Sequence, residues 1–244
     1  MFSLKDHPFA VETFFESSIV LTFAVPVEEL RSLLPVCLTP DTFDEKWGFV
    51  AVAMVSTKKL RPKGFPEFLG NDFFLIGYRV FVRYKNTEGK NLRGLYILKS
   101  ETDKKKMSFF GNIFTHYKYT TTDIKLTKVA DRISVVSEKS GLGISLRTGE
   151  EIQLPTTSPF KDWKEARRFA GPLPFTFTVN NETNEVLIIE GVRESWIPKP
   201  VEVLSHKIHF LDQKGFKEIV LANAFIIENI PYYWKKGKKE IWKP

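Results

Sequence analysis

The sequence predicts a mainly β fold, built as a single antiparallel β-barrel with a few short helices. About a dozen short segments rich in β-branched and aromatic residues follow one another between turn residues, as in antiparallel barrels and sandwiches. Aromatic residues make up 14% of the 244 residues, and aromatic side chains favour strands. Alternating strand and helix units are absent, which argues against a doubly wound parallel sheet.

One domain spanning residues 1–244 is the expected organisation. The hydrophobic content of 43% is enough for a sizeable core. The chain contains neither a fixed-period repeat nor a low-complexity linker, and barrels of this length are often single domains.

The first quarter of the chain is predicted to form strand, short helix and strand. Segment 9–25 alternates apolar and polar residues loosely, which predicts one long strand or two. Pro26 opens a helix over 27–34, because proline suits the first helical position and two glutamates follow near the positive end of the helix dipole. A strand over 47–57 comes next. The loop 58–71 is long for a compact domain, so we expect it to form the rim of a site.

The stretch 73–119 organises the rest of the chain. Two apolar segments, 73–84 and 92–100, flank a polar turn and predict a β-hairpin. Asp103 is the expected N-cap of a following helix, because its carboxylate can accept hydrogen bonds from free backbone N–H groups. Apolar residues at helical spacing would form one stripe of that helix: Met107, Phe110, Phe114 and Tyr117.

The second half is predicted to contain six strands and one helix. The helix begins at Ser158-Pro159 and ends at Gly171-Pro172, a glycine stop followed by proline. The expected strands cover residues 119–126, 132–139, 142–147, 186–192, 201–211 and 218–228.

Charge and cysteine content limit the partners and the compartment. The formal charge is +7, with basic clusters at 104–106 and 235–239. These predict a solvated surface and a flexible basic tail, with nonspecific polyanion binding as the alternative, because no nucleic-acid motif is present. A single cysteine, Cys37, forbids an internal disulfide and fits a reducing compartment, where it would be a half-buried hydrophobe rather than a nucleophile. With no signal peptide and no apolar run of about 20 residues, we expect a cytoplasmic protein without a membrane partner.

Motifs for common cofactors are absent. The sequence has no dinucleotide-binding or phosphate-cradling glycine pattern and no nucleophile elbow. His206 and His209 lie three apart in a predicted strand and would point to opposite faces. We therefore expect no metal and no cofactor.

Several motifs resemble the uncharacterised YqjF-like (DUF2071) bacterial family. They are Leu34-Pro35, residues 39–44, Trp47-Gly48-Phe49-Val50, residues 60–66, Gly94-Leu95-Tyr96, Gly111-Asn112, Thr115-His116-Tyr117, residues 166–175 and residues 230–234. The family is distantly similar to acetoacetate decarboxylase. This resemblance implies a β-barrel enclosing a cavity, in agreement with the strand pattern.

The resemblance also implies candidate catalytic residues. Decarboxylase chemistry uses a lysine amine that attacks a keto-acid carbonyl and must lose its proton in an apolar pocket. Lys118 occupies the corresponding place, with His116 as a candidate acid or base. The chain departs from the decarboxylase pattern in having Lys118-Tyr119 instead of two lysines, and Arg79 near the place of a carboxylate. The alternative for Lys118 is a surface lysine at a helix end.

Arginine and tyrosine side chains are the candidate substrate-binding groups. Arg79 and Arg83 share one strand face with Phe81. If that face lines a cavity the arginines form an anion clamp, and if it meets solvent they are ordinary surface residues. Tyr117 and Tyr119 would contact substrate or serve as packing residues.

The predicted function is binding of a small organic acid or carbonyl compound in the barrel cavity. Arg79 would hold the acid group, with Lys118 or His116 near the carbonyl. If the protein is an enzyme, the resemblance implies a lyase with Schiff-base chemistry of the decarboxylase or aldolase type. The alternative is a non-catalytic ligand-binding or stress-related protein, and a homo-oligomer is left open.

Overall fold

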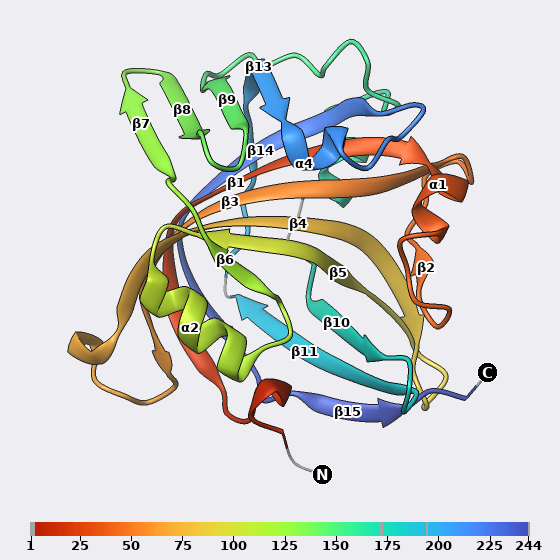
Figure 1. The fold of residues 1–244 in the computed structure, drawn as a ribbon. Helices are drawn as coiled ribbons and strands as arrows, with labels where there is room; N and C mark the ends of the chain where they lie inside the picture. The colour runs from red at the N-terminus through yellow and green to blue at the C-terminus, as the bar shows by residue number, and fades with distance from the viewer. Residues whose placement is uncertain (1–2, 171–172, 194, 244) are drawn as a thin grey trace.

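The computed structural model describes residues 3–170, 173–193 and 195–243, and it is mainly β (Figure 1). The larger sheet follows the order β12-β14-β1-β3-β4-β5-β10-β11-β15, with β2 and β6 attached to β4 and β5. Its strands are β1 (Val11–Pro26), β2 (Thr39–Pro40), β3 (Trp47–Pro62), β4 (Asn71–Lys85), β5 (Asn91–Thr102), β6 (Tyr119–Thr121), β10 (Phe175–Asn180), β11 (Glu185–Arg193), β12 (Lys199–Pro200), β14 (Val220–Trp234) and β15 (Lys238–Ile241).

The larger sheet curls until its two ends meet. Strand β11 pairs with β14 from Gly191 opposite Trp234 to Arg193 opposite Tyr232, which joins the strands into a ring. Most neighbours are antiparallel, as predicted, but β5 pairs in parallel with both β6 and β10. A parallel neighbour requires a crossover connection, and here the chain from 103 to 118 and the long segment before β10 supply it.

A smaller sheet packs on one face of the ring. Its order is β13-β9-β8-β7. The strands are β7 (Lys125–Val129), β8 (Arg132–Ser137), β9 (Leu142–Arg147) and β13 (Glu202–Ile208). Ile133, Val135 and Ile144 join the same buried cluster as Tyr78 and Val80 of β4, so the two sheets share a hydrophobic core.

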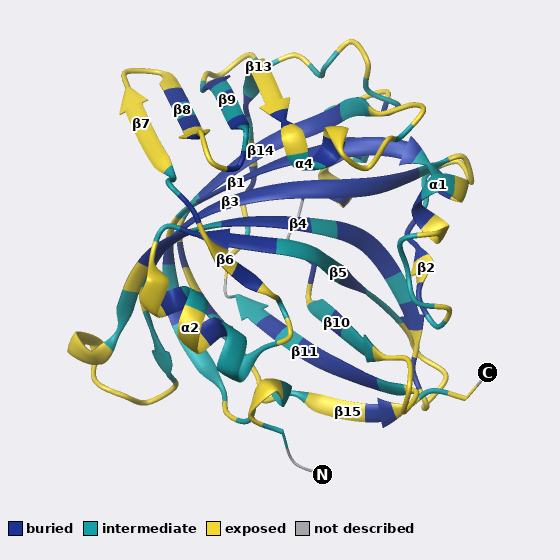
Figure 2. Cartoon of the chain, in the orientation of Figure 1, coloured by how far each residue is buried: buried dark blue, intermediate teal, exposed yellow. Residues whose placement is uncertain are grey.

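Alternate residues of β4 face two different clusters, because side chains of a strand point to opposite faces in turn. Tyr78, Val80 and Val82 face the core shared with the smaller sheet. Phe81 faces a second cluster, in which Phe49 and Phe169 pack with their rings tilted and the ring of Phe81 meets that of Phe169 edge to face. Figure 2 shows β1, β3 and β4 as almost continuously buried. The cavity of the candidate site lies on the second face.

The helices differ from the sequence prediction mainly at their ends. They are η1 (Leu4–Asp6), α1 (Val27–Arg31), η2 (Glu67–Leu69), α2 (Lys105–Phe114), α3 (Trp163–Ala166), η3 (Arg167–Phe169) and α4 (His209–Asp212). The helix predicted from Ser158 is short and is capped instead by Asp162, whose carboxylate accepts from the Glu165 N–H. Its predicted stop, residues 171–172, lies outside the described residues.

Two further predictions of local structure are wrong. Asp103 does not cap α2, because its carboxylate accepts from the Phe74 N–H at 2.7 Å and so ties the helix start to β4. The N-cap is Lys104, which makes no side-chain capping bond. The predicted strand 201–211 ends at Ile208, since His209 begins α4.

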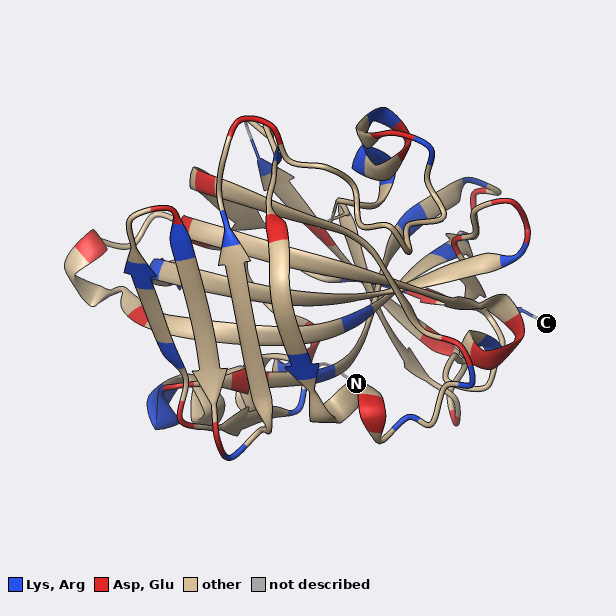
Figure 3. Cartoon of the chain, turned by 90° about the horizontal axis from the view of Figure 1, so that it is seen from above, with Lys and Arg blue, Asp and Glu red and all other residues tan. Residues whose placement is uncertain are grey.

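The predicted flexible basic tail is also wrong. Strand β15 pairs with β11, and the lysines around it form ion pairs. Lys239 Nζ lies 2.7 Å from Asp6 Oδ2, and Lys235 Nζ lies 2.8 Å from Glu190 Oε1. Figure 3 shows basic and acidic segments interspersed over the face seen from above.

Among the described residues, no helix has the length and apolarity needed to cross a membrane. Cys37 is half-buried, and burial raises the pKa of its thiol. That environment favours a packed hydrophobe over a nucleophile.

Candidate functional site: a cationic, acid-free cavity

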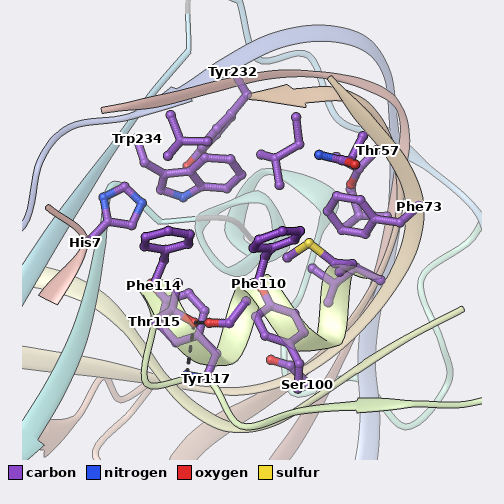
Figure 4. A pocket seen from close by; sticks show the side chains of 18 of the residues that line it. His7, Thr57, Phe73, Ser100, Phe110, Phe114, Thr115, Tyr117, Tyr232 and Trp234 are labelled. Atoms are coloured by element: carbon purple, nitrogen blue, oxygen red, sulfur yellow. Dashed lines mark hydrogen bonds between the residues drawn. The ribbon is translucent and has the colours of Figure 1, made fainter. Parts of the chain in front are cut away.

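A cavity of about 410 Å³ opens between the ring of strands and α2. Its wall is mostly apolar. Figure 4 shows Phe73, Phe110, Phe114 and Trp234 around the space, with Phe110 toward the middle of the view. The helical stripe predicted from the sequence therefore exists in part, because Met107, Phe110 and Phe114 line the cavity.

The charged groups along this cavity are all basic. Arg61, Arg79 and Lys106 line it, and no Asp or Glu does so among the described residues. Arg61 is already neutralised, since its Nη2 lies 2.8 Å from Glu12 Oε1. Arg79 and Lys106 are left as the cations without an acidic neighbour in the lining.

Arg79 is the polar centre of the cavity. Its Nε is buried and has no hydrogen-bond partner among the described residues. The side chain folds back over Gly77, where a Cβ atom would lie 2.8 Å from Arg79 Nε and 2.9 Å from Nη2. The glycine is thus required for the guanidinium to occupy this position.

Three tyrosines act electrostatically on Arg79. Burial lowers the pKa of Arg79, and the neighbouring Tyr119, Tyr117 and Tyr232 raise it. An arginine remains protonated under all ordinary conditions. The guanidinium is therefore a fixed positive charge in an apolar space, which is costly unless an anion joins it.

The same tyrosines are held in their neutral form. Burial raises the pKa of Tyr119 to about 12, although the charge of Arg79 acts in the opposite direction. Burial also raises the pKa of Tyr117 and of Tyr232. Near neutral pH these phenols carry protons and can donate hydrogen bonds to a bound group.

Lys118 does not enter the cavity. Its side chain is exposed, and it is absent from the lining residues. The backbone of Lys118 is left-handed, with φ of 51°. The residues on either side, Tyr117 and Tyr119, line the cavity instead. The apolar surroundings that imine chemistry demands of a lysine are therefore missing at this position.

His116 is also not among the lining residues, although Thr115 and Tyr117 are. Its Nε2 is 3.1 Å from Asp6 Oδ1, a contact that fastens the end of α2 to η1. The arrangement matches a structural histidine at a helix end better than an acid or base in a pocket.

Arg83 forms an ion pair with a buried carboxylate and is not among the residues that line the cavity. It shares the face of Arg79, as predicted, but lies four residues along β4, about 13 Å away at the usual rise of a strand. Its Nε is 2.7 Å from Asp41 Oδ1, and Arg93 Nε contacts the other carboxylate oxygen. Asp41 is fully buried. The predicted clamp of two arginines is therefore reduced to Arg79 alone.

The sequence analysis did not identify two of the polar residues that line the cavity. His7 and Thr57 are 6% and 1% exposed, and His7 Nδ1 and Thr57 Oγ1 have no hydrogen-bond partner among the described residues. Both line the cavity (Figure 4). Burial lowers the pKa of His7. No local signal marks His7, because its place depends on how η1 docks; Thr57 could have been found only by fixing the register of β3.

The described residues contain no group of three or more His, Cys, Asp or Glu side chains able to hold a metal ion. The cavity as described is thus an apolar container with a cation and neutral phenols in its wall. Such a site suits a molecule with one negative end and an apolar body.

The fold is similar to that of acetoacetate decarboxylase and of acetoacetate decarboxylase-like proteins. Acetoacetate decarboxylase from Legionella pneumophila superposes with a TM-score of 0.62 at 14% identity, over 96% of this chain and 88% of that one. An acetoacetate decarboxylase-like enzyme from Sphingomonas wittichii RW1 gives 0.60 at 11% identity, over 98% and 94%. The enduracididine biosynthesis enzyme MppR, complexed with pyruvate, gives 0.59 at 11% identity, over 97% and 92%.

The chain belongs to the DUF2071 family, described as an uncharacterized conserved protein (COG2071), whose model matches residues 15–235. A search of curated proteins finds no match. The structural likenesses are too low in sequence identity to transfer an activity, and they establish the fold.

Proposed function

We propose that the cavity binds a small organic acid whose carboxylate pairs with Arg79. The observation that carries this proposal is the buried Arg79 Nε without a partner, in a cavity whose described lining contains no acid. A carboxylate would satisfy both the charge and the donors of the guanidinium, which pairs with carboxylates in a two-pronged geometry.

The rest of the ligand is apolar, with at most a few oxygen functions. Phe15, Phe73 and Met107 line the space in which its body would lie. In this proposal Tyr117 and Tyr119, which line the same space, donate to a carbonyl or hydroxyl oxygen next to the carboxylate. MppR is complexed with pyruvate, a keto acid, which supports the same chemical class here.

The proposal is one of binding, without an imine step. A Schiff base needs a lysine amine within the cavity, whereas Lys118 is exposed and outside the lining. Lys106 lines the cavity but is itself exposed. We therefore favour the non-catalytic alternative. Borohydride reduction in the presence of pyruvate should leave Lys118 unmodified, and a single adduct at Lys118, lost in Lys118→Ala, would restore the lyase hypothesis.

Calorimetric titration tests the binding. The ligands are pyruvate, phenylpyruvate, 3-phenylpropionate and octanoate, each beside its uncharged methyl ester. We expect at least one acid to bind and its ester to bind far more weakly. Arg79→Met should weaken the acid about 10- to 100-fold, the usual worth of a hydrogen bond to a charged group. The surface variant Lys118→Ala is the matched control and should bind normally. Equal affinity for acid and ester, or an Arg79→Met variant that binds like the wild type, would refute the proposal.

A further inference from the structure

The mouth of the cavity carries exposed aromatic and aliphatic side chains. We call this set the mouth surface: Phe9, Phe65, Phe68, Leu69, Phe109 and Phe110. Phe68 is 84% exposed and Phe109 is 64% exposed. Large apolar side chains so open to water are unusual when they gather in one place, and they mark interaction sites.

Phe9 precedes β1, and two elements supply the other residues of the mouth surface. One is the connection between β3 and β4, which contains η2, and the other is α2; Figure 1 shows both on the same side of the molecule. Leu60, near the end of β3, packs against the cluster that contains Met107 of α2. Leu69 and Phe110 both line the cavity.

The apolar wall continues from the cavity to the outside. The rings of Phe109 and Phe110 have centroids 5.3 Å apart, and those of Phe110 and Phe114 are 6.5 Å apart. Phe9 extends the row, 5.3 Å from Phe114. The row of rings therefore offers apolar contacts both outside the cavity and within it.

Positive charge accompanies the mouth surface. Lys104, Lys105 and Lys106 are all exposed at the start of α2, with Asp103 as the acid beside them, 3.4 Å from Lys104 Nζ. The first turn of α2 has no acidic residue, and its N-cap makes no side-chain bond. Lysines at this end oppose the helix dipole. The three lysines therefore lower the stability of α2. Binding of an anion from outside the chain would account for their position.

We propose that the mouth surface docks on an anionic lipid bilayer. Exposed phenylalanines enter the region between headgroups and acyl chains, while nearby lysines attract acidic headgroups. A second copy of this chain is a poorer occupant, because its own lysine cluster would face this one. The absence of an apolar spanning run, from which no membrane partner was expected, does not bear on a contact at the bilayer surface.

Docking would bring the cavity to a source of its ligand. An acid with an apolar body partitions into bilayers, and the docked cavity would open directly onto that source. This role rests on the proposed function, whereas docking itself does not.

Flotation with vesicles tests the proposal. Full-length protein is mixed with vesicles of phosphatidylcholine alone or of phosphatidylcholine with phosphatidylglycerol. We expect binding to the mixed vesicles, weakened by added salt. The double variant Phe68→Ser/Phe109→Ser should bind about tenfold more weakly, since it removes two inserted rings. Lys104→Glu/Lys105→Glu should weaken binding by a similar factor.

Matched controls lie elsewhere on the surface. Val129→Ser/Ile197→Ser removes side chains of similar exposure, 67% and 69%. Lys125→Glu/Lys139→Glu reverses two exposed lysines of the smaller sheet and its turns. Both control variants should float like the wild type.

The remaining outcomes would overturn docking. They are absence of vesicle binding, equal loss in the controls, or a self-associating protein that Phe68→Ser/Phe109→Ser turns into a monomer without any lipid effect. Calorimetry with soluble acids separates the two proposals. A protein that binds acids but not vesicles refutes docking alone, and one that binds vesicles but no acid refutes the proposed function alone.

Discussion

Two arginines on one face of β4 have opposite surroundings. Arg83 meets Asp41, a fully buried carboxylate that also contacts Arg93. Arg79, four residues earlier, lines a cavity, and its buried Nε has no partner in the part of the chain that the structure describes. Both are arginines on the same face of the same strand, so the sequence alone does not distinguish them.

The difference teaches where function is placed in this fold. A charge that serves the fold is satisfied by the chain itself, because leaving it unpaired in the interior is costly. Under the proposed function, Arg79 is a charge that the chain leaves for a ligand to satisfy. Gly77 leaves the space that its guanidinium occupies, and three tyrosines raise its pKa.

The largest expected effect is on stability, and it comes from removing Asp41, the carboxylate that pairs with Arg83 and Arg93. Asp41→Ala leaves Arg83 and Arg93 facing each other without a carboxylate. We expect the free energy of unfolding to fall by about 3 kcal/mol, toward the low end for a buried pair because both arginines keep some contact with water. Urea unfolding measures it. A loss below about 1 kcal/mol would show that Asp41 is not the element that distinguishes the two arginines.

The next effect concerns the space beside Arg79. Gly77→Ala places a Cβ 2.8 Å from Arg79 Nε, so the guanidinium must move while the backbone need not. We expect acid affinity to fall about tenfold, or about 1.4 kcal/mol, with little change in stability. Gly143→Ala is the matched control, because nothing lies within 4 Å of its added Cβ. Unchanged acid affinity in Gly77→Ala would mean that the present position of the guanidinium is not the binding position.

Sequence reasoning went furthest where the pattern is local. The alternation of β4 correctly placed Arg79, Phe81 and Arg83 on one face. The mainly β class followed from strand composition, and the structural comparisons confirm it. The apolar stripe of α2 followed from its 3.6-residue period.

The candidate site depended on information that is not local. Asp41 is 42 residues from Arg83, so no spacing rule could join them. Lys118 lies one position from two lining residues on either side, and its left-handed backbone before β6 could not be read from the sequence. Tyr117 and Tyr119 took the inward side.

A smaller effect is expected at high pH from the tyrosines around Arg79. The pKa of Tyr119 is raised to about 12 in the folded chain, above the ordinary value near 10. The folded state therefore holds this proton more tightly, and its stabilising effect is complete below pH 10 and lost as the pH rises through 12. Wild type should lose about 1 kcal/mol more than Tyr119→Phe between pH 9 and pH 11. Identical alkaline unfolding curves would contradict this assignment.

The smallest effect is the most direct test of the comparison, because it removes the same charge from both places. Arg83→Met should lower the free energy of unfolding by about 1 kcal/mol, since Asp41 keeps only Arg93. Arg79→Met should leave it unchanged or raise it slightly, because an unpartnered cation is replaced by an apolar chain of similar length in an apolar wall. Urea unfolding of the two variants in the same buffer, without ligand, gives the difference between them. Should Arg79→Met prove as destabilising as Arg83→Met, then Arg79 contributes to the fold after all, and its loss in a binding assay could no longer be assigned to the ligand. Should the two variants separate as expected, the fold is slightly less stable for carrying Arg79, which is the pattern of a residue retained for binding.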